Sequence, residues 1–207
     1  MTMTASHLEL LVEEPSMEAF LRGLLPRLLP RDRTFEVHAF QGKADLLDKL
    51  GMRLRGYADW LPDNWRIVVV VDRDDDDCSA LKERMEAIAE SAGLRSRTRA
   101  GASVWQLVNR IAIEELEAWY FGDWEGLRQV YPRVAATVPS RRGFRDPDAI
   151  AGGTWETLER VMKRHGYFRA GLAKIEMARA LGGRISPERS RSRSFLAFCG
   201  AVLEAVA

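Results

Sequence analysis

IVVVVDRDDDD, at residues 67–77, places a run of carboxylates directly after five consecutive β-branched residues. The apolar run is too short to span a membrane and too continuous for a half-exposed strand, so it predicts a buried central strand of an α/β sheet. Carboxylates at this density repel one another unless a cation, basic side chains or water compensates them. Reactive sites of open α/β sheets lie beyond the carboxyl ends of their strands. The stretch therefore predicts a divalent-metal site that includes Asp72 and Asp74.

The overall composition is that of a folded protein. The chain has 207 residues, 46% of them hydrophobic, which fits one domain or one domain with a substantial extension. Its two cysteines, Cys78 and Cys199, give neither a metal-ligand spacing nor a disulfide framework, so we expect a reducing, cytoplasmic environment. We find no targeting segment and no apolar run of about 18 residues, so we expect a protein without a membrane partner.

Acidic and basic residues are distributed unevenly along the chain. Residues 1–125 contain 16 Lys and Arg against 23 Asp and Glu, whereas residues 126–207 contain 15 against 7. Most of the basic residues in the second part are arginines, which form bidentate contacts with phosphate. This asymmetry suits a metal enzyme with a polyanionic substrate, although it also suits solubility or a contact between the two parts.

Strand and helix patterns alternate through the first 125 residues. This alternation predicts an α/β fold with a mainly parallel sheet flanked by helices. Asp76 or Asp77 is available to cap the helix that follows the acidic run, and Gly93 to end it. The predicted strands are residues 7–12, 35–40, 67–71 and 105–111, with a short edge strand at 94–99, and the predicted helices are residues 15–25, 46–54, 81–89 and 113–121.

The character of the sequence changes near residue 125. Proline, glycine and a pair of arginines predict a long loop at 132–153. Helical patterns follow at roughly 154–165, 171–181 and 187–206. Because these helices are short and their apolar faces need a partner, we expect residues 126–207 to form a basic helical extension packed on an α/β domain of residues 1–125.

Carboxylates from three parts of the chain are candidates for one site. Glu13 or Glu14 follows the first predicted strand, Asp72 and Asp74 follow the Val-rich strand, and the segment 114–117 supplies three more glutamates. Phosphoryl-transfer sites bring such carboxylates together around Mg²⁺ or Mn²⁺, which prefer hard oxygen ligands. The sequence therefore predicts a magnesium or manganese site.

Two of these segments resemble the Toprim domain, a compact α/β fold found in topoisomerases, primases and the OLD-type and RloB-like nucleases. Val12-Glu-Glu-Pro-Ser-Met-Glu18 is similar to the family's V-E-G-x-T/S-E turn after the first strand. Asp72-Arg73-Asp74 is similar to its Asp-x-Asp after the third strand. Glu14 stands where glycine is usual, which leaves open whether Glu13 or Glu14 reaches the metal.

Two further segments resemble a bacterial Toprim-fold family of unknown function related to those nucleases. Glu114-Glu-Leu-Glu-Ala-Trp-Tyr120 is similar to its E-x-E-A-W helix, which places Glu117 at a site position. Ser190-Arg-Ser-Arg-Ser-Phe195 is similar to its C-terminal S-x-S-F segment. The four motifs occur in the expected order and cover most of the chain.

The resemblance implies a Mg²⁺-dependent, nuclease-like protein that acts on the phosphodiesters of DNA or RNA. The glutamate would act as general acid or base and the aspartates would hold the metal. The implied catalytic residues are Glu13, Asp72 and Asp74; the implied metal ligands are the same three with Glu117; and the candidate phosphate contacts are Arg141, Arg142, Arg191 and Arg193.

The implied partners are a nucleic acid, a separate ATPase subunit and a second copy of the chain. The sequence has no G-x-x-x-x-G-K-[ST], so ATP hydrolysis would come from another protein, and the OLD-like resemblance suggests a context of phage defence.

One alternative function is a non-catalytic interaction or nucleic-acid-binding subunit of the same fold, which the departure at Glu14 allows. Another is a haloacid-dehalogenase-type phosphatase, which also has Asp-x-Asp after a strand but leaves Glu13 without a role.

Overall fold

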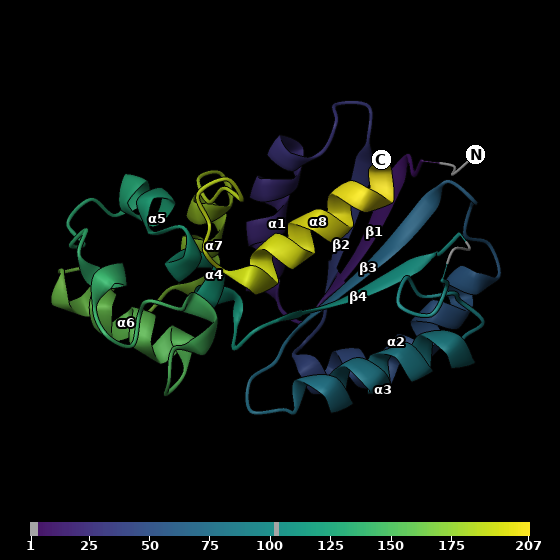
Figure 1. The fold of residues 1–207 in the computed structure, drawn as a ribbon, viewed down its shortest axis with the longest axis horizontal. Helices are drawn as coiled ribbons and strands as arrows, with labels where there is room; N and C mark the ends of the chain where they lie inside the picture. The colour runs from purple at the N-terminus through teal and green to yellow at the C-terminus, as the bar shows by residue number, and fades with distance from the viewer. Residues whose placement is uncertain (1–3, 102–103) are drawn as a thin grey trace.

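A computed structural model describes residues 4–101 and 104–207. Within these residues the centre is a sheet of four parallel strands in the order β2-β1-β3-β4 (Figure 1). The predicted α/β fold with a parallel sheet flanked by helices is confirmed. In chain order the strands are β1 (His7–Val12), β2 (Thr34–Ala39), β3 (Trp65–Asp72) and β4 (Leu107–Ala112).

The Val-rich strand β3 is buried on both faces, as its unbroken apolar sequence predicts. Val68 and Val70 belong to the hydrophobic core on one face of the sheet, whereas Val69 and Val71 belong to the core on the other. Helices cover both faces (Figure 1). They are α1 (Pro15–Leu28) and α8 (Arg193–Val206) on the first face, and α2 (Lys43–Ala58) and α3 (Cys78–Ser91) on the second.

The acidic run after β3 leads into α3 through a side-chain cap. The Asp77 carboxylate accepts a hydrogen bond from the backbone N–H of Ala80 at 2.8 Å, so Asp77 rather than Asp76 is the cap. Gly93, with a φ of +81°, follows the end of the helix in the left-handed region that glycine adopts readily. Both predicted boundaries of this helix are confirmed.

The predicted edge strand at residues 94–99 is wrong. Of these residues Ser96 alone forms a β-bridge, to Leu107. The chain turns here, because the backbone N–H groups of Arg99 and Ala100 both donate to the Ser96 carbonyl, at 3.1 and 2.9 Å. A carbonyl that closes a turn is not available to a neighbouring strand, so the pairing ends after one residue.

Short helices and turns make up the chain after β4. The helix predicted at 113–121 begins later, at Leu116, because Glu115 has an extended backbone with a φ of −147°. The structure also contains a helix at 124–130 that the sequence pattern did not predict. Two single helical turns interrupt the predicted loop at 132–153. The elements are α4 (Leu116–Gly122), α5 (Trp124–Val130), η1 (Val138–Ser140), η2 (Pro147–Ala149), α6 (Thr154–Arg164), α7 (Lys174–Gly182) and α8.

The last helix, α8, begins at Arg193 and not at the predicted residue 187. Ser192 caps it by accepting a hydrogen bond from the backbone N–H of Phe195 at 3.1 Å. The Asp148 carboxylate accepts from the Ser192 hydroxyl at 2.6 Å and from the Ser194 backbone at 3.0 Å. The Ser-rich segment that precedes the helix is thus held as a cap, which hydroxyl side chains favour over helix interiors.

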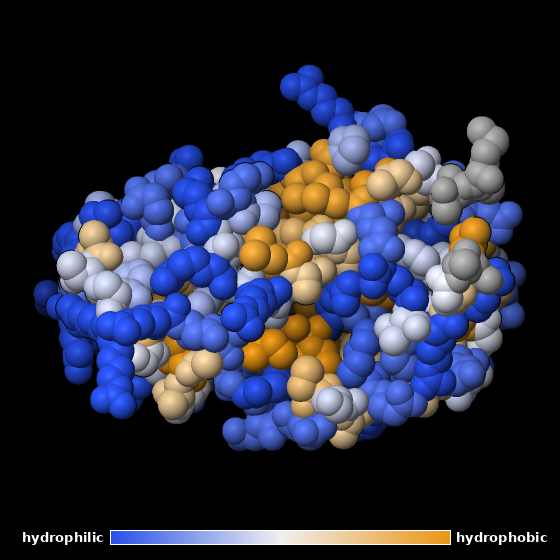
Figure 2. All heavy atoms as spheres, in the orientation of Figure 1, coloured by the Kyte–Doolittle hydropathy of each residue, from blue (hydrophilic) through white to orange (hydrophobic). Residues whose placement is uncertain are grey.

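The face of the molecule in Figure 2 carries apolar surface near its middle, where α8 crosses the sheet, with polar side chains to either side. Leu196 and Leu203 of α8 are each 41% exposed. In residues 4–101 and 104–207, no helix combines the length and the apolar composition that crossing a membrane requires.

The extension at residues 126–207 shares one hydrophobic core with the sheet, and α7 approaches α1 backbone to backbone. A Cβ atom added at Gly182 would lie 2.3 Å from the carbonyl oxygen of Phe20, and one added at Gly23 would lie 2.8 Å from the Gly182 carbonyl carbon. Phe20 and Leu181 belong to the same core cluster. The division into two domains near residue 125 stays a prediction.

We expect Gly182→Ala to lower the free energy of unfolding by about 2–3 kcal/mol, because the added methyl group has no space between two backbones. Gly200→Ala is the matched control, since a Cβ there meets nothing within 4 Å and alanine favours a helix. Urea denaturation of the two variants measures the difference. A neutral Gly182→Ala would contradict the close crossing of α1 and α7.

Candidate metal centre

Carboxylates gather at the carboxyl ends of the two central strands. β1 and β3 are adjacent and parallel, with Val12 opposite Val70, so Glu13, just after β1, and Asp72, the last residue of β3, lie at the same edge of the sheet. The Asp72 backbone N–H donates a hydrogen bond to Glu13 Oε2 at 3.0 Å. The structure therefore brings together these two predicted residues, which lie far apart in the sequence.

Asp72 is the most constrained of the carboxylates. It is 6% exposed, and its Oδ1 atom is buried without a hydrogen-bond partner among the described residues. Burial, reinforced by the charges of Glu13 and Glu117, raises the pKa of Asp72 well above its ordinary value. A buried carboxylate oxygen with no donor is costly, and such atoms mark positions where an ion or water completes the site.

Glu117 joins the same cluster from the first turn of α4. It is 2% exposed, and its Oε2 atom is also buried without a hydrogen-bond partner in the described residues. Burial raises the pKa of Glu117 to about 7, although Lys174 opposes the shift. Because the charge of Glu117 also raises the pKa of Asp72, the two carboxylates act on each other.

Both Glu13 and Glu14 take part in the cluster. Burial raises the pKa of Glu13, against the hydrogen bond from Asp72 and the charge of Lys43, which lower it. Glu14 adds charge at both Asp72 and Glu117, and its carboxylate accepts a hydrogen bond from Ser16. The backbone of Glu14 is extended, with a φ of −145°, a conformation that any residue adopts. Glycine, which is usual at this position of the similar turn, is therefore not required here.

Asp74 lies at the rim of the cluster rather than inside it. Its side chain is 47% exposed and forms an ion pair with Lys43 at 2.7 Å. Its backbone N–H donates to the Glu114 carbonyl at 2.9 Å, and both residues have positive φ values, +49° and +61°. Non-glycine residues in this region are uncommon and concentrate at functional sites.

The three glutamates of the segment 114–117 have different roles. Glu114 forms an ion pair with Arg73. Glu115 accepts hydrogen bonds at the start of α6, from the Thr154 hydroxyl at 2.8 Å and the Trp155 backbone at 2.9 Å. Glu117 is the member of this segment that remains directed into the cluster without a hydrogen-bond partner for Oε2.

Lys174, at the start of α7, is a site residue that the sequence did not predict. Its burial alone would lower its pKa, but the attraction of four carboxylates raises it; these are Glu117, Glu14, Glu115 and Asp72. The Lys174 ammonium also lies 4.9 Å from the centre of the Trp155 ring. A single lysine in a helical extension carries no motif, so no sequence signal identified it.

Tyr120 is a second unpredicted group beside the cluster. Its hydroxyl is buried without a hydrogen-bond partner in the described residues. Burial, with the charges of Glu117 and Asp72, raises the pKa of Tyr120 well above its ordinary value, so the phenol keeps its proton.

The donor chemistry of the cluster suits a hard divalent cation. Within residues 4–101 and 104–207, no three His, Cys, Asp or Glu side chains are grouped so that together they could hold a metal ion. Mg²⁺ is commonly bound by one or two carboxylates, with water and substrate phosphate as the other ligands. The unpartnered oxygens of Asp72 and Glu117 supply two such carboxylates, so the residues present fit the ion.

The predicted arginine contacts lie on the surface. Arg141 and Arg142 are exposed between η1 and η2, and Arg191 and Arg193 are exposed at the start of α8. Arg191 donates a hydrogen bond to the Arg145 carbonyl at 3.3 Å, which links these two segments. Their contact with nucleic acid stays a prediction.

Comparisons with known proteins show the family to which the chain belongs. The solved structures include a match titled "C-terminal region of the Burkholderia pseudomallei OLD protein", with 18% sequence identity, coverage of 98% of this chain and 99% of that chain, and a TM-score of 0.49. The search of curated proteins found no match. The model of the family described as "Domain of unknown function (DUF4276)" matches residues 12–203. The chain therefore belongs to the DUF4276 family.

Proposed function

We propose that this protein is a Mg²⁺-dependent, Toprim-type nuclease that acts on the phosphodiesters of DNA or RNA. The proposal rests on one observation above all: Asp72 Oδ1 and Glu117 Oε2 are buried, negatively charged when ionised, and without hydrogen-bond donors in the described residues. A divalent cation would compensate the charge of both side chains, and carboxylates at the carboxyl ends of parallel strands are typical of catalytic centres. The turn after β1 and the Asp-x-Asp after β3 add the resemblance to the Toprim domain.

Each residue of the cluster has a place in the proposed chemistry. Asp72 and Glu117 would hold the metal ion, and Glu13 and Asp74 would orient water molecules bound to it. Mg²⁺ supplies a Lewis acid that stabilises charge developing on the phosphodiester. Glu13, whose pKa is raised by burial, is suited to move a proton to or from the attacking or leaving oxygen.

The groups from the extension would act on the substrate. Lys174 stays protonated beside four carboxylates, and its ammonium would bind a phosphate oxygen and reduce the repulsion between the polyanion and the site. The Tyr120 phenol keeps its proton and is available as a hydrogen-bond donor. A partner ATPase and a phage-defence context remain part of the proposal only through the family resemblance.

A non-catalytic, nucleic-acid-binding subunit is the second candidate. The ion pair between Asp74 and Lys43 favours it, because an aspartate held at the rim contributes less to a metal site. The phosphatase alternative has less support. The Asp72 backbone donates a hydrogen bond to Glu13, so Glu13 belongs to the site, and a phosphatase of this type gives Glu13 no role.

The proposal is tested by cleavage assays on supercoiled DNA, single-stranded DNA and RNA. We expect the purified protein to cleave at least one of them in Mg²⁺ or Mn²⁺ and to be inactive in EDTA. A matched preparation of Glu13→Gln controls for contaminating nucleases and should be inactive under the same conditions. Folded protein that binds polynucleotide but cleaves none would favour the non-catalytic candidate.

A further inference from the structure

A hollow of about 490 Å³ lies between the edge strand β2 and helix α2, outside the acidic cluster. Glu9, on β1, lies at its floor. It precedes Glu13 by four residues, which corresponds to about 13 Å of extended chain. The walls and rim of the hollow include His38, Phe40, Met52 and Trp60. Its volume lies within the range of pockets that hold small ligands.

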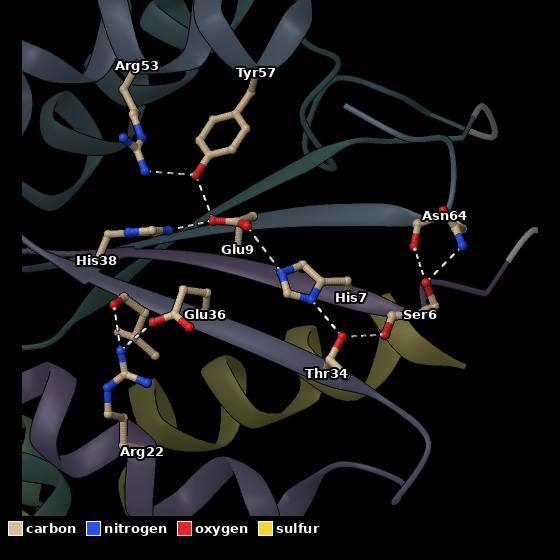
Figure 3. A network of polar contacts seen from close by, with 11 residues as sticks. Ser6, His7, Glu9, Arg22, Thr34, Glu36, His38, Arg53, Tyr57 and Asn64 are labelled. Carbon is tan, nitrogen blue, oxygen red and sulfur yellow. Dashed lines mark hydrogen bonds and ion pairs between the residues drawn. The ribbon is translucent and has the colours of Figure 1, made fainter. Parts of the chain in front are cut away.

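The floor of the hollow is a buried carboxylate with three donors (Figure 3). Glu9 is 7% exposed. Its Oε2 atom accepts hydrogen bonds from His38 Nε2 at 2.6 Å and the Tyr57 hydroxyl at 2.7 Å, and its Oε1 atom lies 3.1 Å from His7 Nε2. Burying and pairing a carboxylate within a core strand is costly, and nothing in the proposed nuclease chemistry uses it.

This hydrogen-bond network determines which ring nitrogen of His38 is left for a ligand. A carboxylate can only accept, so the nitrogen that contacts Glu9 carries the proton. The other ring nitrogen, Nδ1, has no hydrogen bond among the described residues. His38 lines the hollow, and its side chain is 33% exposed. In the neutral form of the ring, Nδ1 is a hydrogen-bond acceptor for a ligand.

Trp60, on the rim of the hollow, is an exposed aromatic side chain that packs against two other rings. Trp60 is 55% exposed, although its ring lies 5.4 Å from that of Tyr57 and 5.6 Å from that of Trp65. Met52, on the same rim, is 67% exposed. Packing against two rings restrains Trp60 while leaving much of its surface open, which favours stacking with a planar ligand.

Two cations complete the rim on α2. Arg53 donates to the Tyr57 hydroxyl at 3.3 Å, and its guanidinium carbon lies 5.3 Å from the centre of that ring. Lys49 also lines the hollow and forms an ion pair with Asp45. Arg53 keeps further N–H groups for an anion, and guanidinium groups bind phosphate in bidentate geometry.

We propose that this hollow binds a nucleoside monophosphate, with the base against Trp60 and Met52 and the phosphate on Arg53 and Lys49. An N–H group of the base would donate to Nδ1 of His38. The same chemistry is offered by a free nucleotide and by the 5′-terminal nucleotide of a strand. The site is separate from the acidic cluster, so this inference does not rest on the proposed nuclease activity.

Calorimetric titration in EDTA tests the proposal, since removing metal keeps the acidic cluster from contributing. The probes are AMP, GMP, CMP and UMP, adenosine, and a short oligodeoxyadenylate with and without a 5′-phosphate. We expect Trp60→Ala and Arg53→Gln each to weaken binding by roughly fivefold or more, the lower end for losing a base–aromatic stack. Leu203→Ala and Arg55→Gln are the matched controls and should change affinity less than about twofold.

The probes separate the sources of the ligand. Tighter binding of the mononucleotides identifies a free nucleotide, and tighter binding of the 5′-phosphorylated oligonucleotide identifies a strand end. Both results support the proposal. Absence of binding to every probe at millimolar concentration, equal binding of adenosine and AMP, or equal losses in the control variants would overturn it, provided that all variants unfold at temperatures near that of the wild type.

Discussion

Asp72→Asn is expected to reduce the metal-dependent cleavage rate by about 10²–10⁴-fold, the range that corresponds to several kcal/mol of lost charge stabilisation. Asparagine keeps the size of the side chain and the backbone N–H that bonds Glu13. It removes the charge, which is the property that the metal requires. The rate is measured on the preferred substrate at saturating Mg²⁺, with single-turnover kinetics to separate chemistry from product release.

The control is Asp75→Asn, which changes an exposed carboxylate in the same acidic run. We expect its rate to stay within about twofold of the wild type. Because Asp72 is buried among like charges, Asp72→Asn should also unfold at the same or a higher temperature. An active Asp72→Asn, or a loss explained by unfolding, would contradict the assigned role.

Glu117→Gln is expected to stabilise the metal-free protein at pH 8 by about 3 kcal/mol and to change its stability little below pH 4.5. The folded-state pKa of Glu117 is about 7, against an ordinary value of 4.5. Between these values the folded protein retains a proton that the unfolded chain releases, so stability falls as the pH rises. Glutamine removes the ionisation and with it this loss.

Urea denaturation in EDTA, between pH 4.5 and pH 8, measures this effect. Glu156→Gln is the control, because Glu156 is exposed and its substitution should give the same small change at every pH. Saturating Mg²⁺ should reverse the order at pH 8, since the wild type then gains binding energy that Glu117→Gln lacks. Destabilisation by Glu117→Gln in EDTA at pH 8 would show that the side chain has a structural partner instead.

The sheet, and the positions of Asp72 and Glu13 at its edge, are predictable from the sequence because local residue patterns encode them. Five β-branched residues in succession determine a strand buried on both faces, and the carboxyl end of that strand determines where Asp72 lies. Glu13 follows from the same reasoning applied to β1. Glu117 has an ordinary helical context, and only the resemblance to a known motif identified it as a site residue.

The failures have local causes of a different kind. Residues 94–99 alternate as a strand does, but the Ser96 carbonyl closes a turn. The segment 187–192 has helical spacing, but Asp148, which is distant in the sequence, holds Ser192 as a cap. Lys174 reaches the carboxylates through the packing of α7 on α1, which depends on two glycines. Tertiary contacts of this kind leave no periodic signal.

Anomalous diffraction from crystals soaked in Mn²⁺ tests directly whether Asp72 and Glu117 bind a metal ion. We expect an anomalous peak between Asp72 and Glu117, within coordination distance of Asp72 Oδ1 and Glu117 Oε2, and no peak at this position in crystals of Asp72→Asn. A hydrogen-bonded water in that position, with Mn²⁺ absent at saturating concentration or bound only elsewhere, would contradict the central claim that these carboxylates form a metal centre.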